Sequence, residues 1–260
     1  MDYPTIEQPI LFLSDVHLGG FSERENARIE SELIQLINYC QRNNIRIAIL
    51  GDLFDYWMEY PDHVPKLGKR LLNRFENFNK NYGPSLFITG NHDNWTRNHL
   101  IKKGFYLEHE HYFFSLNGHR IMTLHGDGLS DAKHNLSRPL MHKLLRNEKF
   151  LEIFQQLFPP RAGIKIMKYF SRLSRFMNSE SEKAHKLDCW AKEQLLTTNI
   201  DIILCGHDHS PRQKHFPFGT YINLGTFYKH KTMAYCNNDV ISLVRWEPDM
   251  QSLKQFETTS

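Results

Sequence analysis

The sequence predicts an α/β fold in which two β-sheets pack face to face and helices flank them. Short apolar runs at residues 10–14, 45–50, 86–89 and 200–205 have the composition of strands buried on both faces. Helical periodicity separates the first run from the second and the second from the third, which predicts strand–helix–strand units with right-handed crossovers. Short aromatic or β-branched runs after residue 105 supply enough further strands for a second sheet.

The first third of the chain alternates between strands and helices. The segment Ser22-Glu23-Arg24-Glu25 has the pattern of a capping box, in which Ser22 caps a helix and Glu25 reaches back to it. Apolar residues at helical spacing continue from there and recur farther along. The expected elements are a strand at 10–14, a helix from 23 to about 43, a strand at 45–50, a helix from about 66 to 81 and a strand at 86–89.

The remaining expected strands are short. Asn117-Gly118 stands between two of them and is a strong signal for a hairpin. These strands are 106–107, 111–116, 120–124, 200–205, 220–223, 232–235 and 240–245. Two sheets packed face to face account for this number of strands.

A basic segment at residues 138–178 interrupts them. It carries nine Lys or Arg against two Glu, a net charge of +7, so the other residues together contribute −4 to the total of +3. Pro159-Pro160 is expected to split the segment into two helices. In the second helix a basic stripe runs beside apolar residues, namely Lys165, Lys168, Arg172 and Arg175 beside Ile166, Tyr169, Phe170, Leu173 and Phe176. Such a helix suits an anionic partner with an apolar part or a membrane surface. A solvated face over a buried one gives the same pattern.

The composition indicates a globular protein of a reducing compartment. Hydrophobic residues make up 40% and charged residues 23% of the chain, which are ordinary globular values. The four cysteines lie far apart without a CxxC pair, so we expect buried thiols. Asp2 and Glu7 precede any long apolar region, and no stretch approaches the roughly 18 apolar residues of a membrane span. We therefore expect a cytoplasmic protein.

Acidic, amide and imidazole side chains directly follow several of the expected strands. In open α/β sheets the carboxyl ends of the strands form the ligand site, and mixed oxygen and nitrogen donors suit hard or borderline divalent ions. A single Asp in such a loop more often only stabilises a turn, so the prediction depends on the ordered set. The candidate ligands are Asp15, His17, Asp52, Asn91, His125, His207 and His209. Seven ligands suit two ions, with Asp52 as the bridge.

Two ions about 3.5–4 Å apart polarise a phosphoryl oxygen and lower the pKa of a shared water. The set therefore predicts a phosphoryl hydrolase. Asp55, Asp93 and Asp127 are interpreted as supporting residues rather than ligands. Asp93 is expected to orient His92, and Asp127 to stabilise its loop or contact the substrate.

These motifs resemble the signature of the calcineurin-like metallophosphoesterases. They are Asp15-Val16-His17, Gly51-Asp52-Leu53-Phe54-Asp55, Gly90-Asn91-His92-Asp93, His125-Gly126-Asp127 and Gly206-His207-Asp208-His209, with Asn223-Leu224-Gly225 as a closing loop. The resemblance implies a four-layer αββα sandwich. It implies one ion held by Asp15, His17, Asp52 and His209 and another held by Asp52, Asn91, His125 and His207. His92 would be a catalytic imidazole that stabilises or protonates the departing oxygen. Mn²⁺ is the expected metal, with Fe or Zn²⁺ as alternatives.

A narrower resemblance is to the UDP-2,3-diacylglucosamine diphosphatases of lipid A synthesis. It is carried by Gly51-Asp52-Leu53-Phe54-Asp55-Tyr56-Trp57, His125-Gly126-Asp127-Gly128-Leu129, Tyr221-Ile222-Asn223-Leu224-Gly225 and the helical insertion. It implies cleavage of a pyrophosphate to UMP and an acylated sugar phosphate, with the insertion clasping the acyl chains. Lys165, Lys168, Arg172, Leu173 and Phe176 are then the expected substrate contacts. This chain has His92 where the best-known branch has Arg.

Together these observations predict a monomer of one domain, residues 1–260, with a helical cap inserted at about 130–195. It is expected to lie at the cytoplasmic face of the inner membrane. The alternatives are a soluble phosphodiesterase or nucleotide phosphatase, or a non-catalytic scaffold. A scaffold would have no reason to keep so many polar groups that are costly to bury. Nucleic acid is not an expected partner, because no recognition motif is present and the positive charge alternates with large apolar residues.

Overall fold

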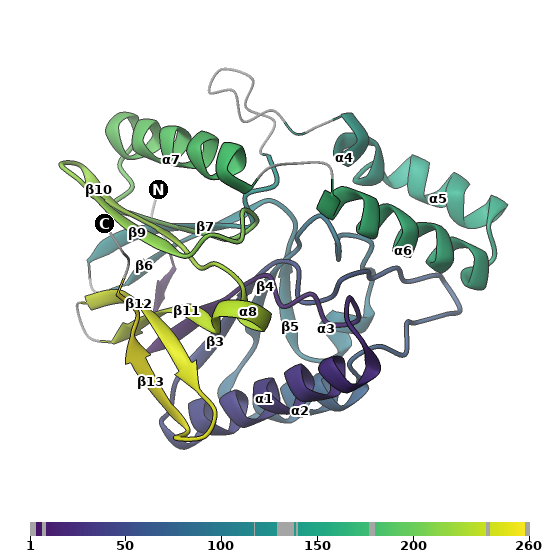
Figure 1. Ribbon diagram of the computed structural model, residues 1–260, viewed down its shortest axis with the longest axis horizontal. Coiled ribbons are helices and arrows are strands. Elements are labelled where there is room, and N and C mark those ends of the chain that lie inside the picture. Colours follow the sequence, from purple (N-terminus) through teal and green to yellow (C-terminus); the bar gives the residue numbers. More distant parts are fainter. Residues whose placement is uncertain are drawn as a thin grey trace.

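Two β-sheets lie face to face between helices, as Figure 1 shows. This computed structural model describes residues 4–6, 9–116, 118–128, 138, 140–176, 180–237 and 240–257. Helices α1 (Glu23–Arg42) and α2 (Lys69–Tyr82) cover one outer face, and α7 (Glu180–Thr197) covers the other. The predicted α/β fold with two packed sheets is confirmed.

The seven-stranded sheet contains the predicted strand–helix–strand units. Its order is β13-β12-β11-β2-β3-β4-β5. Strands β2 to β5 are parallel, while β11, β12 and β13 join β2 as an antiparallel extension. The strands are β2 (Ile10–Leu13), β3 (Arg46–Leu50), β4 (Ser85–Ile88), β5 (Phe105–Glu108), β11 (Thr232–Asn237), β12 (Val240–Glu247) and β13 (Ser252–Gln255). The carboxyl ends of β2, β3 and β4 therefore meet at one edge of the sheet.

The six-stranded sheet has the order β1-β6-β7-β8-β10-β9. Strands β6 and β7 form the predicted hairpin, in which Leu116 pairs with His119; Asn117 of its turn lies outside the described residues. Strands β7, β8 and β10 are parallel. The strands are β1 (Thr5–Ile6), β6 (His111–Leu116), β7 (His119–Leu124), β8 (Ile202–Cys205), β9 (Arg212–Phe216) and β10 (Gly219–Asn223). Strands β1, β9 and β13 were not predicted from the sequence.

Three buried clusters hold the four layers together. Phe12 and Leu50 of one sheet pack with Phe114 and Leu204 of the other in the central cluster. The apolar faces of α1 and α2 pack on the outer face of the seven-stranded sheet, and that of α7 on the six-stranded sheet. Burial of these faces supplies the main hydrophobic stabilisation. The helices that cover the sheet faces do not cover the strand ends, where the loops with the candidate ligands begin.

A group of helices follows β7 and lies beside the strand ends rather than over a sheet face (Figure 1). We call α4 (Leu140–Leu145), α5 (Glu148–Leu157) and α6 (Pro160–Phe176) the helical segment. The expectation of two helices is wrong, because the chain breaks again before Asn147, whose side chain caps α5 by accepting from Phe150 N at 3.0 Å. The remaining short helices are α3 (His99–Lys102) and α8 (Phe227–His230).

Two local expectations need correction. Ser22 caps α1 by accepting from Glu25 N at 3.3 Å, but the Glu25 carboxylate pairs with Arg28 at 2.6 Å instead of completing a capping box. Cys189 is exposed, whereas Cys40, Cys205 and Cys236 are buried as expected. Among the described residues, no helix is long and apolar enough to span a membrane.

Candidate metal centre

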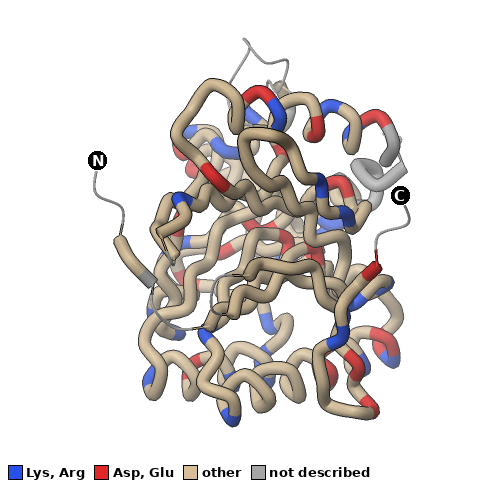
Figure 2. The backbone as a smooth tube through the Cα atoms, turned by 90° about the vertical axis from the view of Figure 1, so that its left-hand side faces the viewer, with Lys and Arg blue, Asp and Glu red and all other residues tan. Residues whose placement is uncertain are grey.

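The candidate ligands converge from loops at the ends of five strands. Asp15 and His17 follow β2, Asp52 follows β3, and Asn91 follows β4. The six-stranded sheet adds His125 after β7, together with His207 and His209 after β8. Because the two sheets face each other, these loops meet at a common edge. In Figure 2 acidic positions lie in the middle of the molecule, among the strands.

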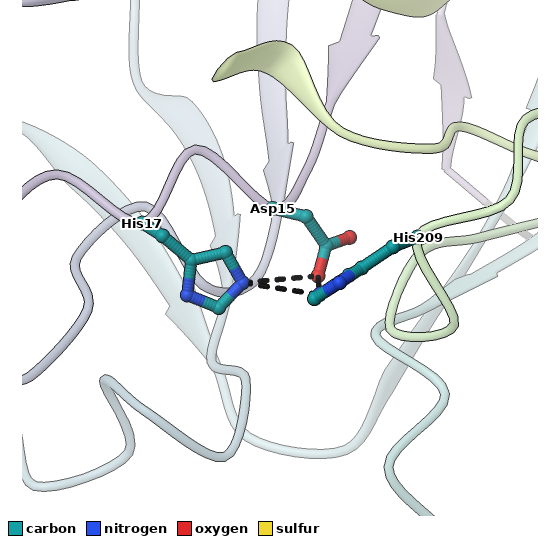
Figure 3. A group of neighbouring side chains, drawn as sticks. All are labelled: Asp15, His17 and His209. Carbon is teal, nitrogen blue, oxygen red and sulfur yellow. Dashed lines mark hydrogen bonds and ion pairs between the residues drawn. The ribbon is translucent and has the colours of Figure 1, made fainter. Parts of the chain in front are cut away.

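Asp15, His17 and His209 form one group of possible ligands (Figure 3). The two Nε2 atoms are 3.2 Å apart, and Asp15 Oδ1 lies 3.7 Å from His17 Nε2 and 3.4 Å from His209 Nε2. Ligands bound to one ion at about 2.1 Å lie roughly 3.0–3.4 Å from one another. The three atoms could therefore surround a single cation if the longest of these distances shortened by a few tenths of an ångström.

Asp52 joins this group to a second one. Its Oδ2 lies 3.8 Å from His17 Nε2 and 3.3 Å from His125 Nε2, and Asp15, Asp52 and His125 also form a possible ligand group. His125 Nδ1 is 2.9 Å from the carbonyl oxygen of Leu50. Since a carbonyl only accepts, Nδ1 carries a proton and Nε2 is left to coordinate. Asp52 thus lies between His17 of the first group and His125 of the second.

Asn91 and His207 are the two remaining candidate ligands. The Asn91 Oδ1 atom is buried without a hydrogen-bond partner. The His207 ring stands edge-on to His125, with 5.1 Å between the ring centres. Burial holds the pKa of His207 well below its usual range, so the ring is neutral and can coordinate.

The buried polar atoms of the site test whether a metal fits. Asp15 Oδ1, Asn91 Oδ1 and His125 Nε2 are all buried without a hydrogen-bond partner, although buried polar groups in proteins are normally paired. Two cations, one beside Asp15 and one beside Asn91 and His125, would satisfy these atoms. The donor set of carboxylate, amide and imidazole fits a hard or borderline divalent ion.

The carboxylates of the site stay ionised. Burial would raise the pKa of Asp15, but its interactions with His17 and His209 hold it well below its usual range. Burial would lower the pKa of His17, but nearby carboxylates, chiefly Asp15 and Asp55, raise it to about 10. The charge of Asp52 outweighs burial and raises the pKa of His125 to about 10. The site therefore draws positive charge strongly.

The site loops are strained. Five of the seven candidate ligands have left-handed backbone: Asp15 (φ 51°), His17 (φ 50°), Asp52 (φ 53°), His207 (φ 74°) and His209 (φ 63°). Each such residue costs about 1–3 kcal/mol, and such strain concentrates at functional sites. The loops also approach closely, since a Cβ on Gly51 would strike the His125 ring and one on Gly90 the Asp52 carboxylate. This explains why glycine precedes the ligand in both motifs.

His92 is absent from the two groups above but forms a third group of possible ligands with His17 and Asp55. Its Nε2 is 3.9 Å from Asp52 Oδ2, and its Nδ1 is 2.9 Å from the Asp55 carbonyl oxygen. Nδ1 therefore carries a proton, and Nε2 is the atom that can accept or give one. Burial, opposed by the charge of Asp52, lowers the pKa of His92.

Asp93 has a different role from the one expected. Its carboxylate accepts from the backbone N–H of Leu53 and of Gly90, both at 2.8 Å, and so ties the loop after β3 to the loop after β4. The Asp55 carbonyl, rather than Asp93, orients the His92 ring. The Asp55 carboxylate supports His17, with Oδ1 3.4 Å from His17 Nδ1.

Asp127 contacts basic residues of the helical segment and the residues before it. Its Oδ2 lies 3.0 Å from Arg146 Nη2 and 3.6 Å from Arg138 Nε. Arg146 also donates to the carbonyl oxygens of Thr89 and His109, at 3.3 and 2.8 Å. These contacts favour the loop-stabilising interpretation of Asp127 over a substrate contact.

Several supporting residues were missed by sequence reasoning. Arg212 donates to both carboxylate oxygens of Asp208, at 2.9 and 2.7 Å, and to Asp188 of α7 at 2.7 Å. Asp208 stands between His207 and His209, so this pairing fixes their loop to α7. Ser14 donates to Asp15 Oδ2 at 2.5 Å. Because all of these are common residue types at unremarkable spacings, no pattern could have singled them out.

The expected substrate contacts lie on α6. Lys165 is exposed, and Lys168 Nζ lies 4.4 Å from the centre of the Tyr56 ring, a cation–π contact. The side chains of Arg172, Leu173 and Phe176 lie outside the described residues.

The sequence profile of calcineurin-like phosphoesterases matches residues 8–211, a range that contains all seven candidate ligands. The chain belongs to the calcineurin-like phosphoesterase family. It is therefore a metal-dependent phosphohydrolase, as the sequence predicts. Family membership implies divalent ions, which the donor set of the site fits. Among solved structures, the phosphoesterase YfcE of E. coli superposes over 94% of this chain and 96% of its own, with a TM-score of 0.46 and 15% identity.

Curated relatives of this phosphoesterase carry the name UDP-2,3-diacylglucosamine hydrolase. The protein of Edwardsiella ictaluri (strain 93-146) is 27% identical over 244 residues, 90% of each chain. That of Wigglesworthia glossinidia brevipalpis is 28% identical over 251 residues, 91% of this chain and 93% of its own. The protein of Porphyromonas gingivalis (strain ATCC BAA-308 / W83) is 29% identical over 141 residues, 53% of each chain.

Proposed function

We propose that this phosphoesterase cleaves the pyrophosphate bond of UDP-2,3-diacylglucosamine to UMP and 2,3-diacylglucosamine 1-phosphate. Relatives with the corresponding name align over 90% and 91% of the chain. The observation that carries the proposal is the position of the helical segment. It contacts the candidate metal centre, because Ser171 of α6 donates to Asp55 at 2.9 Å, and it exposes apolar side chains at Leu140, Leu144, Ile153 and Leu157.

The proposed centre assigns a role to each ligand. One ion is held by Asp15, His17, Asp52 and His209, and the other by Asp52, Asn91, His125 and His207. Mn²⁺ is the proposed metal, with Fe or Zn²⁺ as alternatives. Two such ions would polarise the phosphoryl oxygen and lower the pKa of the attacking water. His92 Nε2 then stabilises or protonates the departing oxygen.

The protein is proposed to be a single domain of residues 1–260 with a cap inserted at about residues 130–195. The helical segment is the part of this insertion that lies beside the strand ends, while α7 packs on the six-stranded sheet. Lys165, Lys168, Arg172, Leu173 and Phe176 are the proposed contacts with the acylated and phosphorylated parts of the substrate. Acyl burial contributes about 0.8 kcal/mol per CH₂, so four groups change affinity by more than about two decades. In this proposal the protein is a monomer that works at the cytoplasmic face of the inner membrane, where basic side chains favour anionic lipid.

Replacing Ile153 with serine is expected to lower kcat/KM for UDP-2,3-diacylglucosamine about tenfold or more. Ile153 is 56% exposed on α5, and a side chain of this kind contributes about 1.5–3 kcal/mol when an apolar surface covers it fully. A small phosphodiester such as bis(p-nitrophenyl) phosphate cannot use this contact. The measurement is the ratio of kcat/KM for the two substrates, with UMP release as the assay for the first.

Ile101→Ser is the matched control. Ile101 is 51% exposed on α3, outside the helical segment, and its loss is expected to leave the ratio unchanged. If Ile153→Ser slows both substrates equally, the helical segment only supports the fold. The function would then be that of a phosphodiesterase or nucleotide phosphatase for small substrates.

A further inference from the structure

Helix α6 lies along the loop that follows Asp55. The close approach begins at Gly163, where a side chain would strike the hydroxyl of Tyr60. Farther toward the C-terminus of α6, Met167 shares a buried cluster with Met58, and Lys168 lies over the Tyr56 ring. Ser171, nearest the end of the helix, contacts Asp55. The helix and the loop run in opposite directions, so the position of α6 along the loop determines which residue faces Asp55.

Ser171 makes the contact nearest the metal centre. Its Oγ donates to Asp55 Oδ2 at 2.9 Å, and both residues are buried, with 6% and 3% exposed. The other oxygen, Asp55 Oδ1, lies 3.4 Å from His17 Nδ1. The opposite ring nitrogen, His17 Nε2, faces Asp15 and His209. A continuous line of side chains therefore leads from α6 to a candidate ligand.

We propose that Ser171 is a positioning residue for the metal centre. The hydroxyl fixes the rotation of the Asp55 carboxylate, and the carboxylate then holds the His17 ring so that Nε2 points at the ion. Carboxylates behind a ligating histidine orient the ring and raise its basicity, and they are themselves held by hydrogen bonds. The inference rests on the proposed metal centre and adds that the helical segment, as well as the core, shapes it.

Mn²⁺ binding without substrate tests the inference. Ser171→Ala is expected to weaken the binding of the ion at His17 by about 10–100-fold, the usual cost of losing such a support. Ser171→Thr keeps the hydroxyl and should bind Mn²⁺ within a few-fold of the wild type. In an Asp55→Asn background, Ser171→Ala should cause no further loss, because Ser171 acts through that carboxylate. Isothermal titration with Mn²⁺ measures each affinity.

Gln155→Ala is the matched control, since it also removes one hydrogen bond between the helical segment and this loop. Gln155 Nε2 donates to the Glu59 carbonyl oxygen at 2.6 Å, away from the candidate ligands, and its loss should leave Mn²⁺ affinity unchanged. Wild-type affinity in Ser171→Ala, or an equal loss in Gln155→Ala, would overturn the inference while leaving the metal centre in place. A wild-type protein that binds none of Mn²⁺, Fe²⁺ and Zn²⁺ would instead refute the proposed centre itself.

Discussion

Asp52→Ala is expected to bind neither ion firmly and to lose hydrolysis by several orders of magnitude. Asp52 Oδ2 lies 3.3 Å from His125 Nε2 and 3.8 Å from His17 Nε2, so one substitution removes a ligand from both proposed positions. Without the bridging carboxylate, less negative charge remains to offset the repulsion between two cations held close together. Elemental analysis should show the metal content falling from near two ions per chain, and the same preparation should be assayed for phosphodiester hydrolysis.

Asp62→Ala provides the comparison for this variant. Asp62 is an exposed carboxylate on the loop that precedes α2, so its removal changes the net charge equally without touching the centre. Metal content and activity should remain those of the wild type. If Asp52→Ala keeps two ions and hydrolysis, Asp52 is not the bridge.

His92→Ala is expected to retain its metal and to lose about 10²–10⁴-fold in kcat, the usual contribution of general acid help. The Asp55 carbonyl holds His92 Nδ1 at 2.9 Å, which leaves Nε2 directed toward Asp52. The imidazole is thus placed to act on the reacting phosphate rather than on the ions. Turnover and metal content are measured on the same sample.

Loss of metal together with activity in His92→Ala would make His92 a ligand, contrary to its assignment. His92→Arg separates the two roles proposed for the imidazole. An Arg at this position supplies a permanent positive charge but cannot give up a proton. Retained activity would indicate charge stabilisation, whereas activity as low as that of His92→Ala would indicate proton donation.

Much of the fold could be predicted from local patterns. Runs such as Ile47–Leu50 end at a Gly-Asp pair because a buried strand must stop before its polar loop, and both signals are visible in the sequence. The candidate ligands could be found for the same reason, since each lies within four residues of the end of a strand. Their convergence follows from the way the two sheets pack.

Contacts between distant segments could not be predicted in this way. Ser171 and Asp55 are 116 residues apart, and a serine in an amphipathic helix carries no signal of its partner. The break between α4 and α5 was missed because an asparagine cap such as Asn147 interrupts the helical spacing of apolar residues less visibly than Pro159-Pro160 does. The role of Asp93 was misassigned because it is adjacent to His92 in the sequence, which suggested a contact between the two side chains. The Asp93 carboxylate instead accepts hydrogen bonds from the backbone N–H groups of Leu53 and Gly90.

The most direct test of the two-metal centre is anomalous diffraction from crystals grown with Mn²⁺. We expect two peaks about 3.5–4 Å apart, the separation typical of such sites. One should lie among Asp15, His17 and His209, and the other among Asn91, His125 and His207, with Asp52 between them. A single peak, or peaks away from these side chains, would contradict the proposed centre.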